Sequence, residues 1–150
     1  MPTKPKLLLY LEGTILDDRA ILYLKVTKHD SGYLRRLGES LPVEGAVEFC
    51  KAMQERFDLV YLGHRGEEQR VVYSEWLQKH GFPEGELIVG GYKAKLPQGI
   101  AYAIDNRVQD AEDVYPKLGI TYIPVNEYGA RWEKVRVKIA NFKSQIADNT

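Results

Sequence analysis

Three short segments with polar side chains each follow directly after a run of apolar residues. Their carboxylates could transfer protons or bind a metal ion, and their imidazole and guanidinium groups could bind an anion. Asp105 is the strongest single candidate, because a carboxylate placed directly after a buried strand often serves function. The three segments are Glu12–Thr14, Gly63–Arg65 and Asp105–Arg107.

The apolar runs before these segments have the length and continuity of strands that are buried on both faces. They alternate with segments of helical spacing, and this alternation predicts an α/β fold with a parallel sheet between two layers of helices. Ligands bind such sheets beyond the carboxyl ends of the strands, which is where all three polar segments are expected to lie. The expected strands are 6–11, 58–63, 87–89, 100–104 and 120–125.

Four helices and one hairpin complete the expected single domain of residues 1–150. Residues 20–26 and 33–37 flank a polar, turn-rich stretch, which predicts a β-hairpin flap over about residues 18–38. The last helix, with apolar residues from Trp132 to Ile146 at spacings of three and four, is expected to pack on the sheet rather than form a dimer contact. The other helices are expected over 46–57, 67–80 and 108–118.

The composition excludes several classes of protein. Lys and Arg together number 21, as do Asp and Glu, so no net charge draws the chain to nucleic acid or anionic lipid. Cys50 is the only cysteine, which excludes an intramolecular disulfide and a thiolate metal cluster, and its place on an apolar stripe predicts burial. No apolar run has the length of a membrane helix or a signal-peptide core, so we expect a cytoplasmic protein.

The segment Tyr10-Leu-Glu-Gly-Thr-Ile15 resembles the opening motif Asp-x-Asp-Gly-Thr-Leu/Val of the haloacid dehalogenase-like (HAD) superfamily. Leu59–Gly63 is similar to the second HAD motif, a strand ending in Ser or Thr, and Ala101–Arg107 is similar to the fourth, a strand ending in an acidic pair. Lys93 or Lys95 lies where the lysine of the third motif would be. The resemblance implies a Rossmann-like, three-layer fold without a large cap, most similar to the 3′-phosphatase domain of polynucleotide kinase.

The resemblance also implies roles for individual residues. Tyr10 stands where the family has its nucleophilic Asp, Glu12 stands at the second acid, and Gly63 replaces the hydroxyl residue that holds the phosphate. Asp105 keeps a metal-binding carboxylate, whereas Asn106 replaces the second acid of that pair. Only weak Mg²⁺ binding, at Asp105 and Glu12, is therefore expected.

The remaining residues of the three segments could form a phosphate or ligand site. The backbone and side chains of Gly13, Thr14 and Gly63 would contribute beside polar or charged groups. These groups belong to His64, Arg65, Lys93, Lys95, Asn106 and Arg107. The alternative is that these residues have only structural roles. Tyr10 would then be a core aromatic, Glu12 would cap a turn, and the histidine and arginines would be ordinary surface groups.

Three functions are open at this point. The first is a non-catalytic, vestigial phosphatase-fold module that binds a phosphorylated ligand or a protein partner. The second is an active Mg²⁺-dependent phosphomonoester hydrolase acting on nucleotides or nucleic-acid ends, in which His64 or Arg65 would lower the pKa of Tyr10 for a tyrosyl-phosphate mechanism. The third is a structural oligomer subunit. The loss of the nucleophile favours the first.

Overall fold

The computed structural model describes residues 4–26 and 31–148, with the side chains of residues 4–25 and 32–141. Five strands form one parallel sheet in the order β5-β4-β1-β6-β7, which confirms the predicted α/β architecture. The strands are β1 (Lys6–Tyr10), β4 (Asp58–Gly63), β5 (Glu86–Val89), β6 (Ile100–Asp105) and β7 (Thr121–Pro124).

The first strand lies at the centre of the sheet because its side chains are apolar on both faces. Leu7 and Leu9 join the larger of two core clusters, whereas Leu8 and Tyr10 join the smaller cluster. Successive side chains of a strand point to opposite faces, so the continuous run Leu7–Tyr10 fills both cores at once. Strand β1 therefore holds the two halves of the domain together and delivers residue 10 to the carboxyl edge of the sheet.

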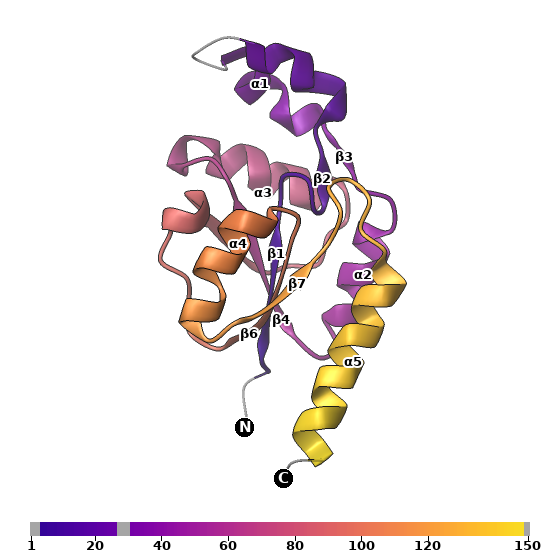
Figure 1. The fold of residues 1–150 in the computed structure, drawn as a ribbon. Helices are drawn as coiled ribbons and strands as arrows, with labels where there is room; N and C mark the ends of the chain where they lie inside the picture. Colours follow the sequence, from indigo (N-terminus) through magenta and orange to yellow (C-terminus); the bar gives the residue numbers. More distant parts are fainter. Residues whose placement is uncertain (1–3, 27–30, 149–150) are drawn as a thin grey trace.

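Helices cover both faces of the sheet and give it three layers. Figure 1 shows α4 on one side of the sheet, with α2 and α5 on the other. The α-helices of this body are α2 (Ala46–Met53), α3 (Arg70–Lys79), α4 (Val108–Val114) and α5 (Trp132–Asp148). Short 3₁₀ turns occur at η3 (Glu67–Gln69), η4 (Gly91–Lys93) and η5 (Pro116–Leu118).

The last helix packs through its apolar face, as its amphipathic pattern predicted. Trp132, Val135 and Ile139 are buried in the larger core cluster, and the Trp132 ring stacks on Phe49 with centroids 4.7 Å apart. The side chains of residues 142–148 lie outside the described ones. Cys50 is buried, as predicted. Within the described ranges, no helix combines the length and the apolar character needed to cross a membrane.

The flap predicted over residues 18–38 is helical, so the predicted strands there are wrong. The segment folds as η1 (Arg19–Val26), α1 (Ser31–Arg36) and η2 (Leu37–Glu39), and residues 27–30 of the predicted loop lie outside the described part. Tyr33 and Leu37 are both fully buried four residues apart, which is helical spacing. An antiparallel pair is present at the base of the flap, where β2 (Leu16–Asp17) pairs with β3 (Leu41–Pro42).

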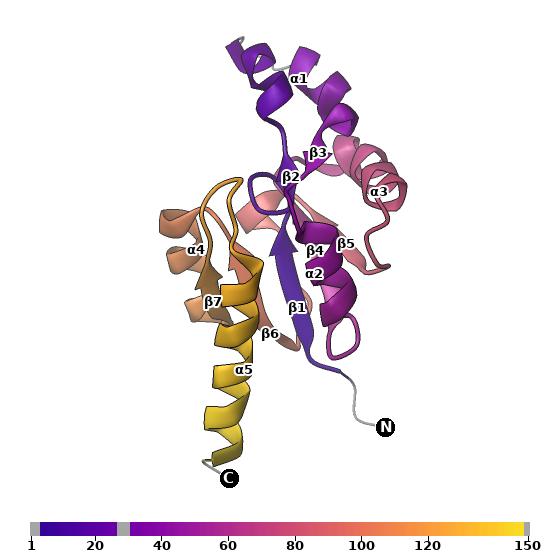
Figure 2. The same ribbon diagram turned by 90° about the vertical axis from the view of Figure 1, so that its right-hand side faces the viewer.

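The helical flap stands beyond the carboxyl end of β1, as Figure 2 shows. Buried Asp18 holds it there, because one carboxylate oxygen accepts a hydrogen bond from the Tyr33 hydroxyl at 2.5 Å. The other oxygen accepts a hydrogen bond from the hydroxyl of Tyr128, which lies in the loop between β7 and α5. Lys25 lies over the Tyr33 ring at 4.4 Å from its centre. Through Tyr128, the base of the flap is thus tied to the loop between β7 and α5.

Candidate functional site at the carboxyl edge of the sheet

The sheet register brings the three polar segments to one edge. Tyr10 is the partner of Leu62 in β4, and Leu9 is the partner of Ile104 in β6, so the residues that follow these strands are neighbours. The chain turns sharply after β1, where the Leu11 carbonyl accepts hydrogen bonds from the backbone N–H groups of Thr14, Ile15 and Leu16. This turn directs residues 12–14 back across the strand ends.

Tyr10 is a fully buried side chain whose hydroxyl lies 2.8 Å from Nδ1 of His64. Its ring stacks on Tyr92 with centroids 5.2 Å apart, and the Arg107 guanidinium lies 5.5 Å from the ring centre. Burial raises the pKa of the phenol above its ordinary value, and the positive charge of Arg107 offsets only part of that effect. A tyrosyl-phosphate mechanism needs a lowered pKa at Tyr10, and this environment has the opposite effect.

His64 is a neutral imidazole at pH 7. Burial lowers its pKa to about 4, with further lowering by the positive charges of Arg107, Arg65 and Lys25. The Tyr10 hydroxyl and Nδ1 of the neutral imidazole share a hydrogen bond, in which the His64 tautomer decides which group donates. His64 therefore holds the Tyr10 hydroxyl and carries no charge for an anion.

Glu12 is a buried carboxylate whose two oxygens are held by protein donors. One oxygen accepts a hydrogen bond from the backbone N–H of His64 at 3.0 Å, and the other accepts one from the Tyr73 hydroxyl at 2.5 Å. Its side chain is only 5% exposed, and burial raises the pKa of the carboxyl above its ordinary range. Glu12 is thus more than a turn cap, because it joins β1 to β4 and α3.

Gly63 is required at the end of β4 because an aromatic ring occupies the space beside it. A Cβ atom at this position would lie 2.4 Å from Cε2 and 2.7 Å from Cζ of Tyr73, closer than real Cβ contacts permit. The Tyr73 hydroxyl also accepts a hydrogen bond from the backbone N–H of Arg65 at 3.0 Å. The position at which the resemblance expects a phosphate-binding hydroxyl is therefore beside a phenol that binds Glu12 instead.

Asp105, at the end of β6, is fully buried and surrounded by tyrosines. One carboxylate oxygen accepts hydrogen bonds from the hydroxyls of Tyr92 and Tyr115, both at 2.8 Å. The other accepts one from the backbone N–H of Arg107 at 2.9 Å. Burial raises the pKa of this carboxyl, and the hydrogen bonds and Arg107 oppose the rise.

Thr14 and Asn106 form a second contact between the ends of β1 and β6. The Thr14 hydroxyl donates to Oδ1 of Asn106 at 2.8 Å, and Nδ2 of Asn106 donates to Glu127 at 3.2 Å. Gly13 lies beneath this amide with a φ of 87°, and a Cβ there would lie 2.6 Å from Nδ2 of Asn106. Only glycine combines this conformation with this close approach.

The predicted cations do not form one cluster. Arg107 is half-buried over Tyr10, and the Arg65 guanidinium lies 5.5 Å from the centre of the Tyr33 ring in the flap. Lys93 and Lys95 are both exposed. It is Tyr92, directly before Lys93, that reaches Asp105.

The donors at this edge do not fit a magnesium ion. Mg²⁺ requires near-octahedral oxygen ligands, but the carboxylate oxygens of Glu12 and Asp105 already accept hydrogen bonds from protein groups. Among the described residues, no group of three or more His, Cys, Asp or Glu side chains could hold a metal ion.

The sequence analysis missed the tyrosines that bind the two carboxylates. Tyr73 lies in α3, Tyr115 directly after α4, and Tyr92 in η4 directly before Lys93, and none of them was a predicted site residue. The available signal was the tyrosine count, since 10 of 150 residues are tyrosine and each buried hydroxyl needs a partner.

Substitution of Gly63 tests the packing of Tyr73. We expect Gly63→Ala to lower the free energy of unfolding by about 2–3 kcal/mol, because the added methyl group overlaps the ring. Gly38→Ala is the control, since its Cβ would meet Val72 at an ordinary 3.6 Å. In a Tyr73→Ala background, Gly63→Ala should cost little. Urea denaturation of all the variants measures both effects, and an equal cost in the two backgrounds would contradict this packing.

The depressed pKa of His64 predicts a loss of stability in acid. A folded-state pKa of about 4 against an ordinary value of 6.5 gives a contribution that is complete above pH ~6.5 and is lost as the pH falls toward 4. Because His64 is only partly buried, we expect this loss to be about 1–2 kcal/mol. Denaturation at pH 7 and 4.5 should show a smaller drop for His64→Gln than for wild type. Equal drops would show that His64 is not the titrating group.

Comparison with known proteins supports the fold at low sequence identity. No family model and no curated protein sequence matches the chain. A chain of the Pnkp1/Rnl/Hen1 RNA repair complex superposes with a TM-score of 0.64 and 14% identity, over 83% of this chain and 43% of that one. The class C acid phosphatase from Bacillus anthracis, with tungstate bound, gives 0.60 and 20%, over 85% and 68%.

The HAD-hydrolase YfnB from Bacillus subtilis, bound to magnesium, gives a TM-score of 0.58 and 13% identity, over 83% of this chain and 89% of that one. This chain therefore spans less than half the length of the RNA repair chain and most of the length of YfnB. The strand order, the position of the flap after β1 and these neighbours together show a HAD-like fold.

Proposed function

We propose that this chain is a non-catalytic module with a phosphatase-type fold, which acts by binding rather than by hydrolysis. The observation that carries the proposal is the state of the two acidic side chains left at the strand ends. Glu12 and Asp105 are both buried and both held by tyrosine hydroxyls, and the nucleophile position is a buried tyrosine with a raised pKa. These residues stabilise the edge of the sheet instead of attacking a phosphate.

Two further observations support the loss of hydrolysis. A phosphoryl group at this edge would need a hydroxyl or a free cation beside it, yet Tyr73 fills the space next to Gly63 and the Thr14 hydroxyl is bonded to Asn106. Glu12, as the general acid, would have to give up the Tyr73 hydrogen bond before it could reach a leaving group. Where this chain differs from the family motif, a neighbouring side chain fills the space or takes the hydrogen bond. Tyr73 does so beside Gly63, and Asn106 does so for Thr14.

The comparisons support a role in binding a partner or a ligand. One neighbour is a chain of an RNA repair complex that holds several proteins, which makes a protein partner or a phosphorylated ligand a reasonable target. The runner-up is an active phosphatase, which the fold of the acid phosphatase and YfnB neighbours favours. We place both roles in the cytoplasm.

A phosphatase assay separates the two functions. With p-nitrophenyl phosphate and Mg²⁺, we expect no turnover above background from wild type, and none from the Tyr10→Asp/Glu12→Asp variant as long as Tyr92 and Tyr115 occupy Asp105. Calorimetry should likewise show no saturable Mg²⁺ binding. Mg²⁺-dependent turnover by wild type that Asp105→Asn abolishes would overturn the non-catalytic proposal.

A further inference from the structure

A basic groove lies beside β7, next to the end of β6, and none of the candidate site residues described above lines it. It has a volume of about 360 Å³ and is lined by Val108, Pro124, Val125, Asn126, Arg131, Lys134, Val135 and Lys138. This volume is in the range of small-molecule sites. Three of the lining residues are cations, and the described lining includes no carboxylate.

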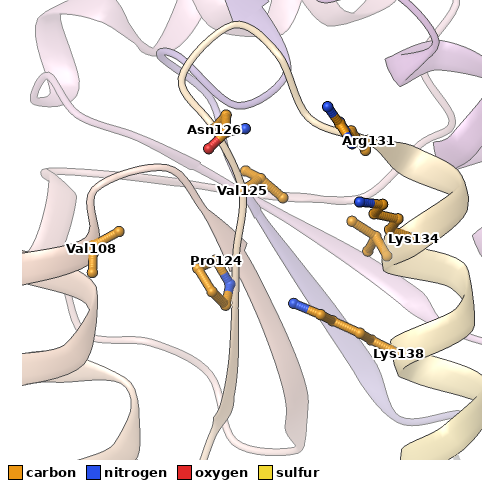
Figure 3. A pocket seen from close by; sticks show the side chains of 8 residues that line it. Val108, Pro124, Val125, Asn126, Arg131, Lys134 and Lys138 are labelled. Carbon is orange, nitrogen blue, oxygen red and sulfur yellow. The ribbon is translucent and has the colours of Figure 1, made fainter.

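The three cations come from α5 and from the residue directly before it. Arg131, Lys134 and Lys138 follow each other at spacings of three and four residues, which places them on one side of a helix over about 10 Å. Figure 3 shows the Lys134 and Lys138 side chains reaching from α5 toward the segment of Pro124 and Val125. All three side chains are exposed.

The wall opposite these cations is fixed by contacts with the strand edge. The backbone N–H of Val125 donates to the Asp105 carbonyl at 3.1 Å, and that of Tyr128 donates to the Gly13 carbonyl at 2.8 Å. Glu127, the nearest acid along this loop, accepts a hydrogen bond from Asn106. The groove therefore has one wall that is held by backbone hydrogen bonds and is apolar at Pro124 and Val125, and a second wall that carries the positive charges.

We propose that this groove binds a small phosphorylated compound, with its phosphate or diphosphate group on the α5 cations and an apolar part against Val108, Pro124 and Val125. Three cations in so small a volume require a ligand with several negative charges close together. A phosphate group supplies nearly two charges and several acceptor oxygens in the space of one carboxylate, so it fits better than an acidic peptide. A nucleic-acid strand fits less well, because no aromatic side chain in the described lining could stack on a base.

The proposal is independent of the catalytic state of the strand ends. None of the residues that line the groove belongs to the motifs discussed above. Phosphatase activity in wild type would therefore leave the groove proposal unchanged. Failure of groove binding would likewise leave the non-catalytic proposal unchanged.

Pyrophosphate is the probe for this site, titrated at constant ionic strength and followed by calorimetry and amide chemical shifts. We expect saturable binding to wild type, with shift changes centred on Val125, Asn126 and Lys134. The Lys134→Gln/Lys138→Gln variant should bind at least about tenfold more weakly. The matched control is Lys51→Gln/Lys117→Gln, which removes the same charge from exposed lysines elsewhere and should bind like wild type.

Four results would overturn the proposal. One is no saturable binding of pyrophosphate, and another is equal weakening in both double variants, which would indicate general charge attraction. A third is equal binding of sulfate and pyrophosphate, which would mark an adventitious ion only. The fourth is tighter binding of hexaglutamate or of a single-stranded oligodeoxynucleotide through the same two lysines, which would assign the groove to a different class of partner. Thermal unfolding of each variant verifies that it is folded.

Discussion

Two carboxylates buried at the carboxyl edge of one sheet set the requirements for everything around them. A carboxylate out of water is costly unless hydrogen-bond donors surround it, and the strand ends supply only a few backbone N–H groups. Glu12 and Asp105 therefore depend on the hydroxyls of Tyr73, Tyr92 and Tyr115. These tyrosines in turn fix where α3, η4 and the end of α4 can lie. The edge is consequently a polar core that is closed by aromatic rings.

Most of the fold could be predicted because its signals are local. The continuous apolar run of β1 and the helical spacing of α5 each depend on residues close together in the chain, and both elements formed where predicted. The flap could not be predicted in the same way. Its apolar residues Ile21, Tyr33 and Leu37 suit a short strand as well as a short helix, and the contact that decides between them is with distant parts of the chain.

The site could be predicted only in part, for a related reason. The position of residues 12, 63 and 105 at one edge follows from strand order, because parallel strands end on the same side. The hydroxyl donors that bind Glu12 and Asp105 come from residues up to 61 positions away in the chain, as with Glu12 and Tyr73. No spacing rule connects such a pair. The choice between Tyr10 as a nucleophile and Tyr10 as a core aromatic likewise depends on burial and on Tyr92, neither of which a motif records.

The close approach of Gly63 to Tyr73 also constrains the order in which the sequence could have changed. A tyrosine ring cannot occupy its present place while residue 63 has a Cβ atom, so any earlier side chain at position 63 would have to be lost before Tyr73 took up that place, or together with it. If an ancestor held phosphate through a hydroxyl at this position, that hydroxyl disappeared no later than the ring arrived. The step is hard to retrace, because a side chain returned to position 63 would meet an occupied site, and removal of Tyr73 would leave Glu12 without its hydroxyl donor. The geometry of one glycine thus gives any such change a direction.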